Sequence, residues 1–429
     1  MPMKLAGTDP VRLLPTSRDA AADARPDSHQ RLQLNHDFSV IHTRDAFAAD
    51  NPALLQVLRR REPAKRHRVA VFVDDGVLRA CPELPQRIRG YADTHAAHLE
   101  IAGEIVPLPG GEVCKNDPQH LWRLLQALAD RNIDRHSYAL AIGGGAALDT
   151  VGLAASLFHR GVRHIRLPST VLSQADSGVG VKNAINLNGQ KNLIGSFAVP
   201  WAVINDAALI DGLPAREKRA GMAEAVKVAL IRDASFFRWL EARADALARF
   251  EQPDLEELIQ RSAALHLRQI TQGGDPFEQG SARPLDYGHW IAHKLERLSA
   301  HALNHGEAVA IGIACDARYS ALAGLLPAGD EARVWRLLRA LGFELWHEQL
   351  LAQDEHGRLA LLQGLGEFRE HLGGDLCVTL LEELGRGREV NTVDGERVMQ
   401  SILWLQQRHA APSPDARAGI HEAICGAAR

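Results

Sequence analysis

The sequence predicts an α/β fold, in which an N-terminal Rossmann-like parallel-sheet domain is followed by an all-helical C-terminal domain. Between residues 31 and 213, short β-branched runs alternate with amphipathic stretches, as expected for a parallel sheet covered by helices. From residue 214 to 410 the strand signals fade and helical periodicity dominates. Residues 1–30 and 411–429 show no sustained periodicity and are predicted to be tails.

The individual elements follow from local patterns. The clearest predicted strands lie at 68–73, 138–142, 164–167 and 202–205, and turn-forming residues follow each of them. The predicted helices span 216–248, 254–271, 285–298, 307–323 and 330–341. A chain of 429 residues is long enough for two domains. We expect a small-molecule site in the cleft between them.

The composition excludes several classes of protein. The net charge of -4 gives no reason to expect a nucleic-acid partner. No apolar stretch approaches the roughly 18 residues that span a bilayer, so no membrane partner is expected. The five cysteines are scattered and odd in number, which argues against a disulfide framework and against a zinc–cysteine site. We expect a cytoplasmic protein that acts on a small molecule.

A run of three glycines indicates a dinucleotide site. Gly143, Gly144 and Gly145 follow a strand and open a helix, so backbone amides there can approach a pyrophosphate. The spacing departs from G-x-G-x-x-G, and a plain tight turn is the alternative. Asp74 ends an earlier strand, where a carboxylate can accept hydrogen bonds from ribose hydroxyls or only satisfy a turn. A polar turn adds Glu112 and Lys115.

A long polar segment from residue 168 to 195 combines glycines and small residues with charged side chains. It contains Asp176, Lys182, Lys191 and Asn192. Ammonium groups together with backbone amides suit a phosphate or a polyhydroxylated ligand. A solvated surface loop is the alternative, although long loops are more often functional.

Three helical segments carry candidate metal ligands. Glu224 shares a helix face with Lys227. On a second predicted helix, His289 and His293 lie four residues apart, and a third begins with His305. One carboxylate and two imidazoles with an open position form a catalytic zinc-type site. The two histidines also resemble the zinc-protease helix, but Trp290 stands where that motif needs a glutamate. With 20 histidines in the chain, a surface or core role is the alternative for each one.

Taken in order, these segments resemble the sugar phosphate cyclase superfamily, whose best-known members are the 3-dehydroquinate synthases. The resemblance runs from about residue 69 to 323. It implies a divalent metal, zinc or cobalt, held by Glu224, His289 and His305. It also implies an NAD site formed by Asp74, Glu112, Lys115, Gly144, Gly145, Asp149, Ser169 and Thr170.

The resemblance further assigns residues to a phosphorylated sugar substrate. The implied catalytic residues are Asp176, Lys182, Lys227 and His293, and the implied substrate-binding residues are Arg160, Lys191, Asn192, Arg268, Arg283 and Asp286. Arg160 would reach the phosphate bound by the neighbouring subunit, which implies a homodimer. In the implied reaction a hydroxyl is transiently oxidised, phosphate leaves, hydride returns, and the opened sugar closes in an intramolecular aldol step, so NAD is regenerated.

The sequence departs from the 3-dehydroquinate synthase pattern at three places. Asp286 stands where asparagine is usual, and Arg283 is displaced by one residue from the usual arginine. Arg268 replaces a substrate-binding lysine, which is not a neutral exchange at a close-fitting site. The segment 368–374 replaces a lysine-rich phosphate segment. The substrate is therefore either that of 3-dehydroquinate synthase or another sugar phosphate, such as a heptulose phosphate cyclised to a valiolone-like cyclitol.

Two other classes of protein compete with a cyclase. Metal-dependent polyol dehydrogenases of the glycerol dehydrogenase type share the two-domain plan and a glycine-rich turn, but they lack the polar segment in this form. A binding or scaffold protein that has kept the fold is the non-enzymatic alternative.

Overall fold

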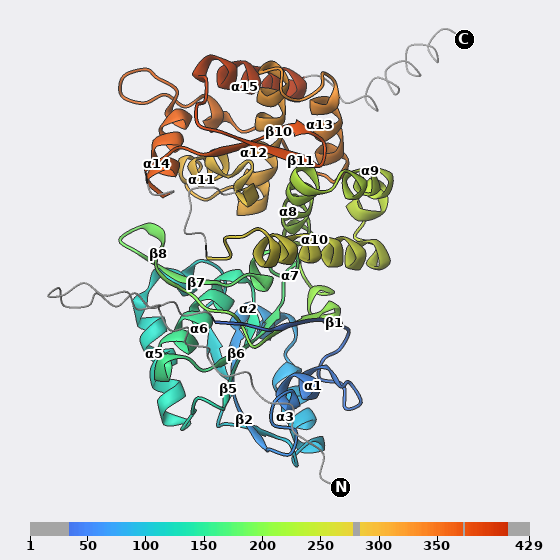
Figure 1. Ribbon diagram of the computed structural model, residues 1–429, viewed down its shortest axis with the longest axis vertical. Helices are drawn as coiled ribbons and strands as arrows, with labels where there is room; N and C mark the ends of the chain where they lie inside the picture. Colours follow the sequence, from blue (N-terminus) through green and yellow to red (C-terminus); the bar gives the residue numbers. More distant parts are fainter. Residues whose placement is uncertain (1–33, 278–283, 372–373, 411–429) are drawn as a thin grey trace, which may run out of the picture.

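The computed structural model describes residues 34–277, 284–371 and 374–410, and it confirms the predicted fold class. Figure 1 shows a sheet-containing domain at the N-terminal end of the chain and a helical domain beyond it. The predicted tails at 1–30 and 411–429 and the candidate residue Arg283 lie outside the described residues.

The first domain is built on a parallel sheet. Among the described residues its strands follow the order β1-β9-β6-β5-β2-β3, and β4 also pairs with β2. Every pair in this sheet is parallel. The strands are β1 (Ser39–Thr43), β2 (His67–Asp74), β3 (Leu99–Ile101), β4 (Val106–Leu108), β5 (Tyr138–Gly143), β6 (Arg163–Pro168) and β9 (Ala202–Asp206).

Helices cover both faces of this sheet, which explains why its central strands are almost continuously apolar. Along β2, Val69 and Val71 pack with residues of α1 and α3, whereas Ala70 and Phe72 pack with residues of α5 and α6 on the opposite face. The helices of this domain are α1 (Ala53–Arg59), α2 (Asp75–Ala80), α3 (Leu84–Thr94), α4 (Val113–Asn116), α5 (Pro118–Asp130), α6 (Gly145–Leu157) and α7 (Val171–Ala175).

The strand order reverses at β2. From β2 the chain goes to β3 and β4 on one side and then to β5 on the other. In open α/β sheets, ligands bind outside the carboxyl ends of the strands at such a reversal. The residues at this point are Asp74, which ends β2, and Gly143, which ends β5.

The second domain is mainly helical. Its helices are α8 (Ala215–Arg232), α9 (Ala234–Ala248), α10 (Gln252–Gln272), α11 (His289–Leu298), α12 (His305–Leu322), α13 (Asp330–Ala340), α14 (Gln363–His371) and α15 (Gly395–Ala410). Helix α12 is central, since it packs against α8, α11, α13 and α15. The predicted single helix 216–248 is interrupted because Asp233 is extended and caps α9, where its carboxylate accepts from the backbone of Ser235 and Phe236.

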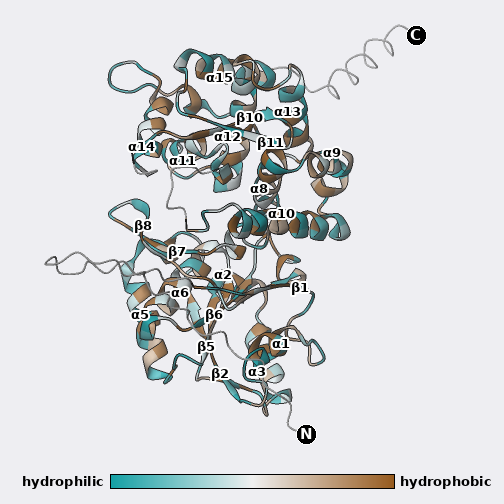
Figure 2. Cartoon of the chain, viewed as in Figure 1, coloured by the Kyte–Doolittle hydropathy of each residue, from teal (hydrophilic) through white to brown (hydrophobic). Residues whose placement is uncertain are grey.

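Two antiparallel hairpins were not predicted. One joins β7 (Lys182–Leu187) to β8 (Gln190–Phe197) within the segment expected to be a loop. The other joins β10 (Val378–Glu383) to β11 (Arg386–Val390) within the helical domain. Strand β11 is mostly exposed and polar, so it lacks the alternation that identifies a strand. Figure 2 shows the tip of the β7–β8 hairpin as hydrophilic.

Among the described residues, none of the helices combines the length and apolar character needed to cross a membrane.

Candidate active site

Three helices of the second domain bring Glu224, His289 and His305 together. Their potential ligand atoms all lie within 4.8 Å of one another. Oε1 of Glu224 is 3.6 Å from Nε2 of His289 and 3.3 Å from Nε2 of His305. Glu224 lies in the interior of α8, whereas each histidine is the first residue of its helix. The predicted ligands therefore form one cluster at the junction of α8, α11 and α12.

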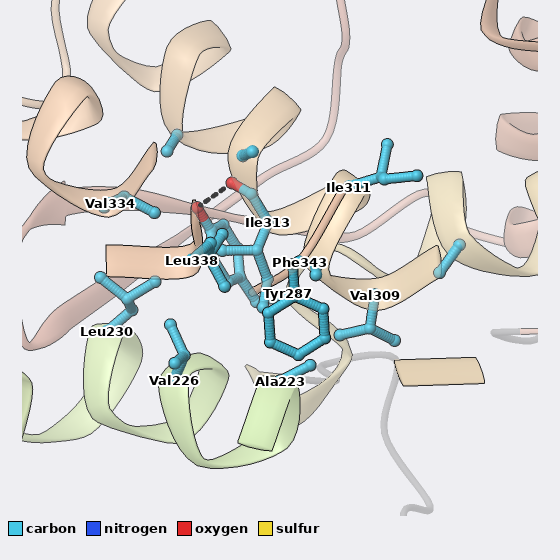
Figure 3. Packing of buried hydrophobic residues seen from close by; sticks show 14 of the residues in the cluster. Ala223, Val226, Leu230, Tyr287, Val309, Ile311, Ile313, Val334, Leu338 and Phe343 are labelled. Carbon is cyan, nitrogen blue, oxygen red and sulfur yellow. Dashed lines mark hydrogen bonds between the residues drawn. The ribbon is translucent and has the colours of Figure 1, made fainter. Parts of the chain in front are cut away.

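The start of α11 is fixed by the core. Tyr287 is fully buried among the residues of Figure 3, and its hydroxyl donates to the carbonyl of Ile313 over 3.1 Å. Gly288 follows with a φ of 78°, where a Cβ would lie 2.8 Å from the backbone nitrogen of Ile313. Only glycine fits this turn. The turn aims His289, the next residue, at Glu224.

The hydrogen bonds of the two histidines leave their Nε2 atoms facing Glu224. Nδ1 of His289 is 3.1 Å from the carbonyl of Tyr287, and Nδ1 of His305 is 2.7 Å from Oε1 of Glu296. Both partners act as acceptors, so each Nδ1 carries the proton. Oε1 of Glu224 is buried and has no hydrogen-bond donor. Two imidazole nitrogens and a carboxylate oxygen around one point fit a divalent metal of the zinc type.

The charged groups of this cluster shift one another's pKa values. Burial lowers the pKa of His289, which favours the neutral ring that a metal requires. Burial also lowers the pKa of His305, but the adjacent carboxylates of Glu224 and Glu296 outweigh this effect and raise the pKa to about 10. A metal bound here would therefore replace the Nε2 proton of His305. Burial raises the pKa of Glu224, but the neighbouring Lys227 outweighs it and holds the pKa well below its ordinary value.

Lys227 connects the metal cluster to the first domain. Its ammonium contacts Glu224 and lies 3.2 Å from Oδ2 of Asp176, while Oδ1 of Asp176 is 3.1 Å from Nδ1 of His266. Burial lowers the pKa of Lys227, but the carboxylates of Asp176 and Glu224 outweigh it and raise the pKa above the usual lysine value. Lys227 is thus a buried cation. His266 was not among the predicted residues, because a single histidine on a long helix carries no sequence signal.

Asp286 and His293 extend the same cluster. Burial raises the pKa of Asp286, but the charge of Lys182 and the neighbouring His289 outweigh it and lower the pKa, so this carboxylate is ionised at neutral pH. The ring of His293 lies 5.5 Å from that of His289 and 6.0 Å from that of His305, between ring centroids. His293 is exposed to solvent.

Glu296 is a further member that the sequence reading missed. Its buried carboxylate accepts from Nζ of Lys191 over 2.5 Å with one oxygen and binds His305 with the other. Its position seven residues after His289 on the same helix face was the available signal. The sequence does not show that His305 and Lys191 are the partners of Glu296, so the spacing alone did not identify it as a site residue.

The carboxyl ends of β2 and β5 form the predicted dinucleotide region. Asp74 accepts from the backbone nitrogen of Gly76 over 2.7 Å, and a Cβ added to Gly143 would lie 3.0 Å from the Cβ of Asp74. A Cβ on Gly145, the first residue of α6, would lie 2.8 Å from Oγ of Ser177. That buried hydroxyl has no hydrogen-bond partner. An unpartnered hydroxyl beside a helix N-terminus fits the pyrophosphate of a dinucleotide.

A polar network borders this region. Nζ of Lys115 donates to Oδ2 of Asp149 over 2.8 Å and also to the side chain of Asn192. The amide of Asn186 donates to Glu112 over 2.9 Å and accepts from the backbone nitrogen of Asn192 over 2.9 Å. The β7–β8 hairpin is thereby attached to α4 and α6, and four of the predicted residues meet.

Ser169 and Thr170 lie at the end of β6, next to the glycine turn. The backbone nitrogen of Ser169 donates to the carbonyl of Gly143 over 2.9 Å. Thr170 caps α7 through a reciprocal pair of hydrogen bonds with Ser173. A Cβ on Gly144 would lie 3.5 Å from the side chain of Thr170, so these residues share one wall of the region.

Two predicted residues lie away from the cluster. Arg160 is exposed beyond the far end of α6, a helix of 13 residues that spans about 20 Å at ~1.5 Å per residue. His159, Arg160 and Gly161 all have positive φ values, of 52°, 60° and 123°. Arg268 is exposed on α10, two residues after His266. Side chains two residues apart lie on different faces of a helix, so Arg268 does not point to Asp176 as His266 does.

Arg166 is the largest fully buried side chain and was predicted only as part of a strand. It donates to the carbonyls of Gly178, Gly180 and Lys182 and to the side chain of Asn183, over 2.7 to 3.1 Å. These acceptors lie in the turn after Asp176 and at the start of β7. A strand residue on β6 thereby determines the path of the segment that carries two predicted catalytic residues.

Comparison with known proteins places this site in an enzyme class. A 2-epi-5-epi-valiolone synthase from Streptomyces hygroscopicus subsp. jinggangensis 5008, solved with NAD+ and Zn2+ bound, matches 88% of this chain and 99% of its own, with a TM-score of 0.77 and 25% identity. A probable glycerol dehydrogenase from Sinorhizobium meliloti 1021 shares the fold alone, with a TM-score of 0.54 and 17% identity. By fold, the chain resembles the sugar phosphate cyclases.

The sequence comparisons are more specific. Models of the N-terminal and C-terminal regions of 3-dehydroquinate synthase match residues 105–220 and 221–361. A 3-dehydroquinate synthase from Acinetobacter baumannii (strain SDF) is 35% identical over 320 residues, which cover 74% of this chain and 86% of that relative. One from Xylella fastidiosa (strain 9a5c) is 32% identical over 364 residues, 83% of this chain and 86% of that relative. The chain belongs to the 3-dehydroquinate synthase family.

Proposed function

We propose that this chain is an NAD- and divalent-metal-dependent sugar phosphate cyclase, which eliminates phosphate from a seven-carbon sugar phosphate and closes the carbon ring by an intramolecular aldol reaction. The observation that carries the proposal is the contact of Lys227 with both Glu224 of the metal cluster and Asp176 of the first domain. This contact links the proposed metal ligands to the segment that borders the proposed dinucleotide region. The similar 2-epi-5-epi-valiolone synthase was solved with NAD+ and Zn2+, and a 2-deoxy-scyllo-inosose synthase of similar fold was solved with carbaglucose-6-phosphate, NAD+ and Co2+.

The residues of the site have distinct proposed roles. Glu224, His289 and His305 would hold the metal, and the turn at Gly144 and Gly145 with Asp74 would hold NAD. Together these groups would supply hydride transfer at a polarised hydroxyl. Lys227 is a cation held beside the metal ligands, and it would stabilise negative charge that develops on the same oxygen. Lys182, Lys191, Asn192 and His293 would contact the substrate and its phosphate.

Asp286 bears on the choice of substrate. Burial raises the pKa of Asp286, but the nearby Lys182 and His289 outweigh it and lower the pKa, which favours the ionised carboxylate. A substrate carboxylate next to Asp286 would be repelled, whereas a neutral hydroxyl or hydroxymethyl group could donate a hydrogen bond to it. We therefore propose that a heptulose phosphate without a carboxylate is preferred over a heptulosonate phosphate. The relative at 35% identity is a 3-dehydroquinate synthase, so both substrates belong in the test.

Phosphate release distinguishes these possibilities. Purified protein with NAD+ and Zn2+ or Co2+ is incubated with heptulose, heptulosonate and hexose phosphates, while inorganic phosphate and absorbance of NADH are followed. The proposal expects phosphate release without net NADH and fastest with the heptulose phosphate. Faster release from the heptulosonate phosphate would identify a 3-dehydroquinate synthase. Steady NADH formation from a polyol would instead support a dehydrogenase.

The position of Arg160 supports a homodimer. It lies about 20 Å from the glycine turn along α6, too far to serve the site of its own subunit. Its backbone occupies the left-handed region, which is costly for residues other than glycine and is typical of functional turns. We propose that Arg160 completes the partner's site. Each mixed dimer of Arg160→Met with His289→Ala should then contain one complete site and have about half the activity of the unmodified dimer, whereas an Arg160 acting in its own subunit would leave no complete site.

A further inference from the structure

The carboxylate of Glu296 is shared between two domains. One oxygen is 2.7 Å from Nδ1 of His305, a proposed metal ligand of the helical domain. The other is 2.5 Å from Nζ of Lys191, which lies on β8 in the sheet-containing domain. Glu296 is 3% exposed, so neither contact is replaced by water. Buried charges in a protein are stable only when paired, and each oxygen here has its own partner.

The two metal-ligand histidines are held in different ways. Nδ1 of His289 bonds a backbone carbonyl, which no side-chain change removes, whereas Nδ1 of His305 depends on the Glu296 side chain. A carboxylate on Nδ1 fixes the orientation of the ring and makes its Nε2 a better ligand. The same carboxylate holds Lys191, whose side chain is 38% exposed on β8, the exposed strand of the hairpin.

We propose that Glu296 is a positioning residue that orients His305 for the metal and couples this ligand to the β7–β8 hairpin. Metal binding and ordering of the hairpin would then favour each other, and the effect must be reciprocal. The hairpin carries Lys191 and Asn192, so a metal-loaded site would also present the substrate-binding face of the hairpin. This inference rests on the metal site of the proposed function.

The test measures metal affinity rather than activity. Zn2+ and Co2+ affinities are measured by competition with a chelator for the unmodified protein, Glu296→Gln, Lys191→Met and the double variant, and the Co2+ absorption spectrum is recorded. Glu296→Gln should weaken binding roughly 10- to 100-fold, as loss of such partners does, and change the Co2+ spectrum. Lys191→Met should weaken it several-fold, and the double variant should be no worse than Glu296→Gln.

Glu367→Gln is the matched control. Glu367 pairs with Lys294 at 3.0 Å and with Arg297, both on α11, but contacts no histidine of the cluster. It should leave metal affinity and the Co2+ spectrum unchanged. In a second measurement, hydrogen exchange of residues 182–197 should slow on metal binding in the unmodified protein, and this slowing should be lost in Glu296→Gln. If Glu296→Gln fails to fold, metal affinity and hydrogen exchange are measured on Lys191→Met, which changes an exposed side chain.

The outcomes separate the two proposals. An unmodified protein that binds neither Zn2+ nor Co2+ would overturn the proposed function itself. An unmodified protein that binds metal, with Glu296→Gln equal to it in affinity and spectrum, would overturn the positioning role alone. A loss of affinity without any change in hairpin exchange would overturn the coupling to the β7–β8 hairpin.

Discussion

The guanidinium of Arg166 and the side-chain oxygen of Asn183 form a 2.7 Å hydrogen bond where neither side chain reaches solvent. A Cβ on Gly152 of α6 would lie 1.8 Å from that oxygen, so Asn183 packs directly on a glycine of the helix. Arg166 also holds three carbonyls of the turn between Asp176 and Lys182. The geometry of the two proposed catalytic residues thus depends on a buried strand residue.

Arg166→Met should disturb this turn. It leaves several buried acceptors unpaired, which costs on the order of 3 kcal/mol of stability, and it should lower kcat/KM for phosphate release at least tenfold, or ~1.4 kcal/mol. Arg166→Lys should recover part of both. Arg163→Met is the control, because Arg163 lies on the same strand but pairs with Glu62. Activity of Arg166→Met equal to that of the control would contradict the assignment.

Asp286→Asn should shift substrate choice. Removing the negative charge relieves repulsion of a carboxylate, so the ratio of kcat/KM for heptulosonate phosphate over heptulose phosphate should rise about tenfold, or ~1.4 kcal/mol. The measurement is initial-rate phosphate release with both substrates. An unchanged ratio would mean that Asp286 does not determine the substrate preference, and that Arg268 or residues outside the described part of the chain do.

Gly144→Ala tests the dinucleotide region without crowding the protein. A Cβ on Gly144 meets the Thr170 side chain at 3.5 Å, an ordinary contact, and the φ of -72° suits alanine. The melting temperature should fall by only a few degrees, since alanine is a poor helix cap. Affinity for NAD+, measured by calorimetry, should fall roughly tenfold or more because the methyl group keeps the pyrophosphate from the backbone. Unchanged NAD+ affinity would argue against this position for the dinucleotide.

Asp316 predicts a pH dependence of stability. Burial raises its pKa from an ordinary 3.8 to about 8, and its carboxyl accepts from the indole of Trp290 over 3.1 Å. Between these pH values the folded protein keeps a proton that the unfolded chain has released. The stabilisation from this group is therefore complete below about pH 4 and lost as the pH rises through about 8.

Asp316→Asn removes this dependence, because an amide accepts the same hydrogen bond and does not ionise. As the pH rises from 4 to 8, the melting temperature of the variant minus that of the unmodified protein should increase by on the order of 5 °C. The check is a series of thermal unfolding curves for both proteins across this range. Two parallel curves would mean that Asp316 is ionised in the folded state.

Local periodicity was enough to predict the sheet-containing domain and the helical domain, and the resemblance to the sugar phosphate cyclases named three candidate metal ligands that lie together in the structure. Ligand residues are chemically distinctive, and strand and helix periods are short, so both can be read along the chain. The split at Asp233 and the two hairpins were not predicted, because a single extended residue and short polar strands leave weak local patterns.

The tertiary structure alone decided which residues act together. Glu296 and Lys191 are 105 positions apart in sequence, and nothing local marks Glu296 as the partner of His305. Arg166 resembles any strand residue until its four acceptors surround it. Arg160 and Arg268 have suitable chemistry, but the length of α6 and the facing of α10 direct them away from the cluster. The sequence determined which groups are available, and packing determined their partners, because pairing across distant elements depends on the whole fold.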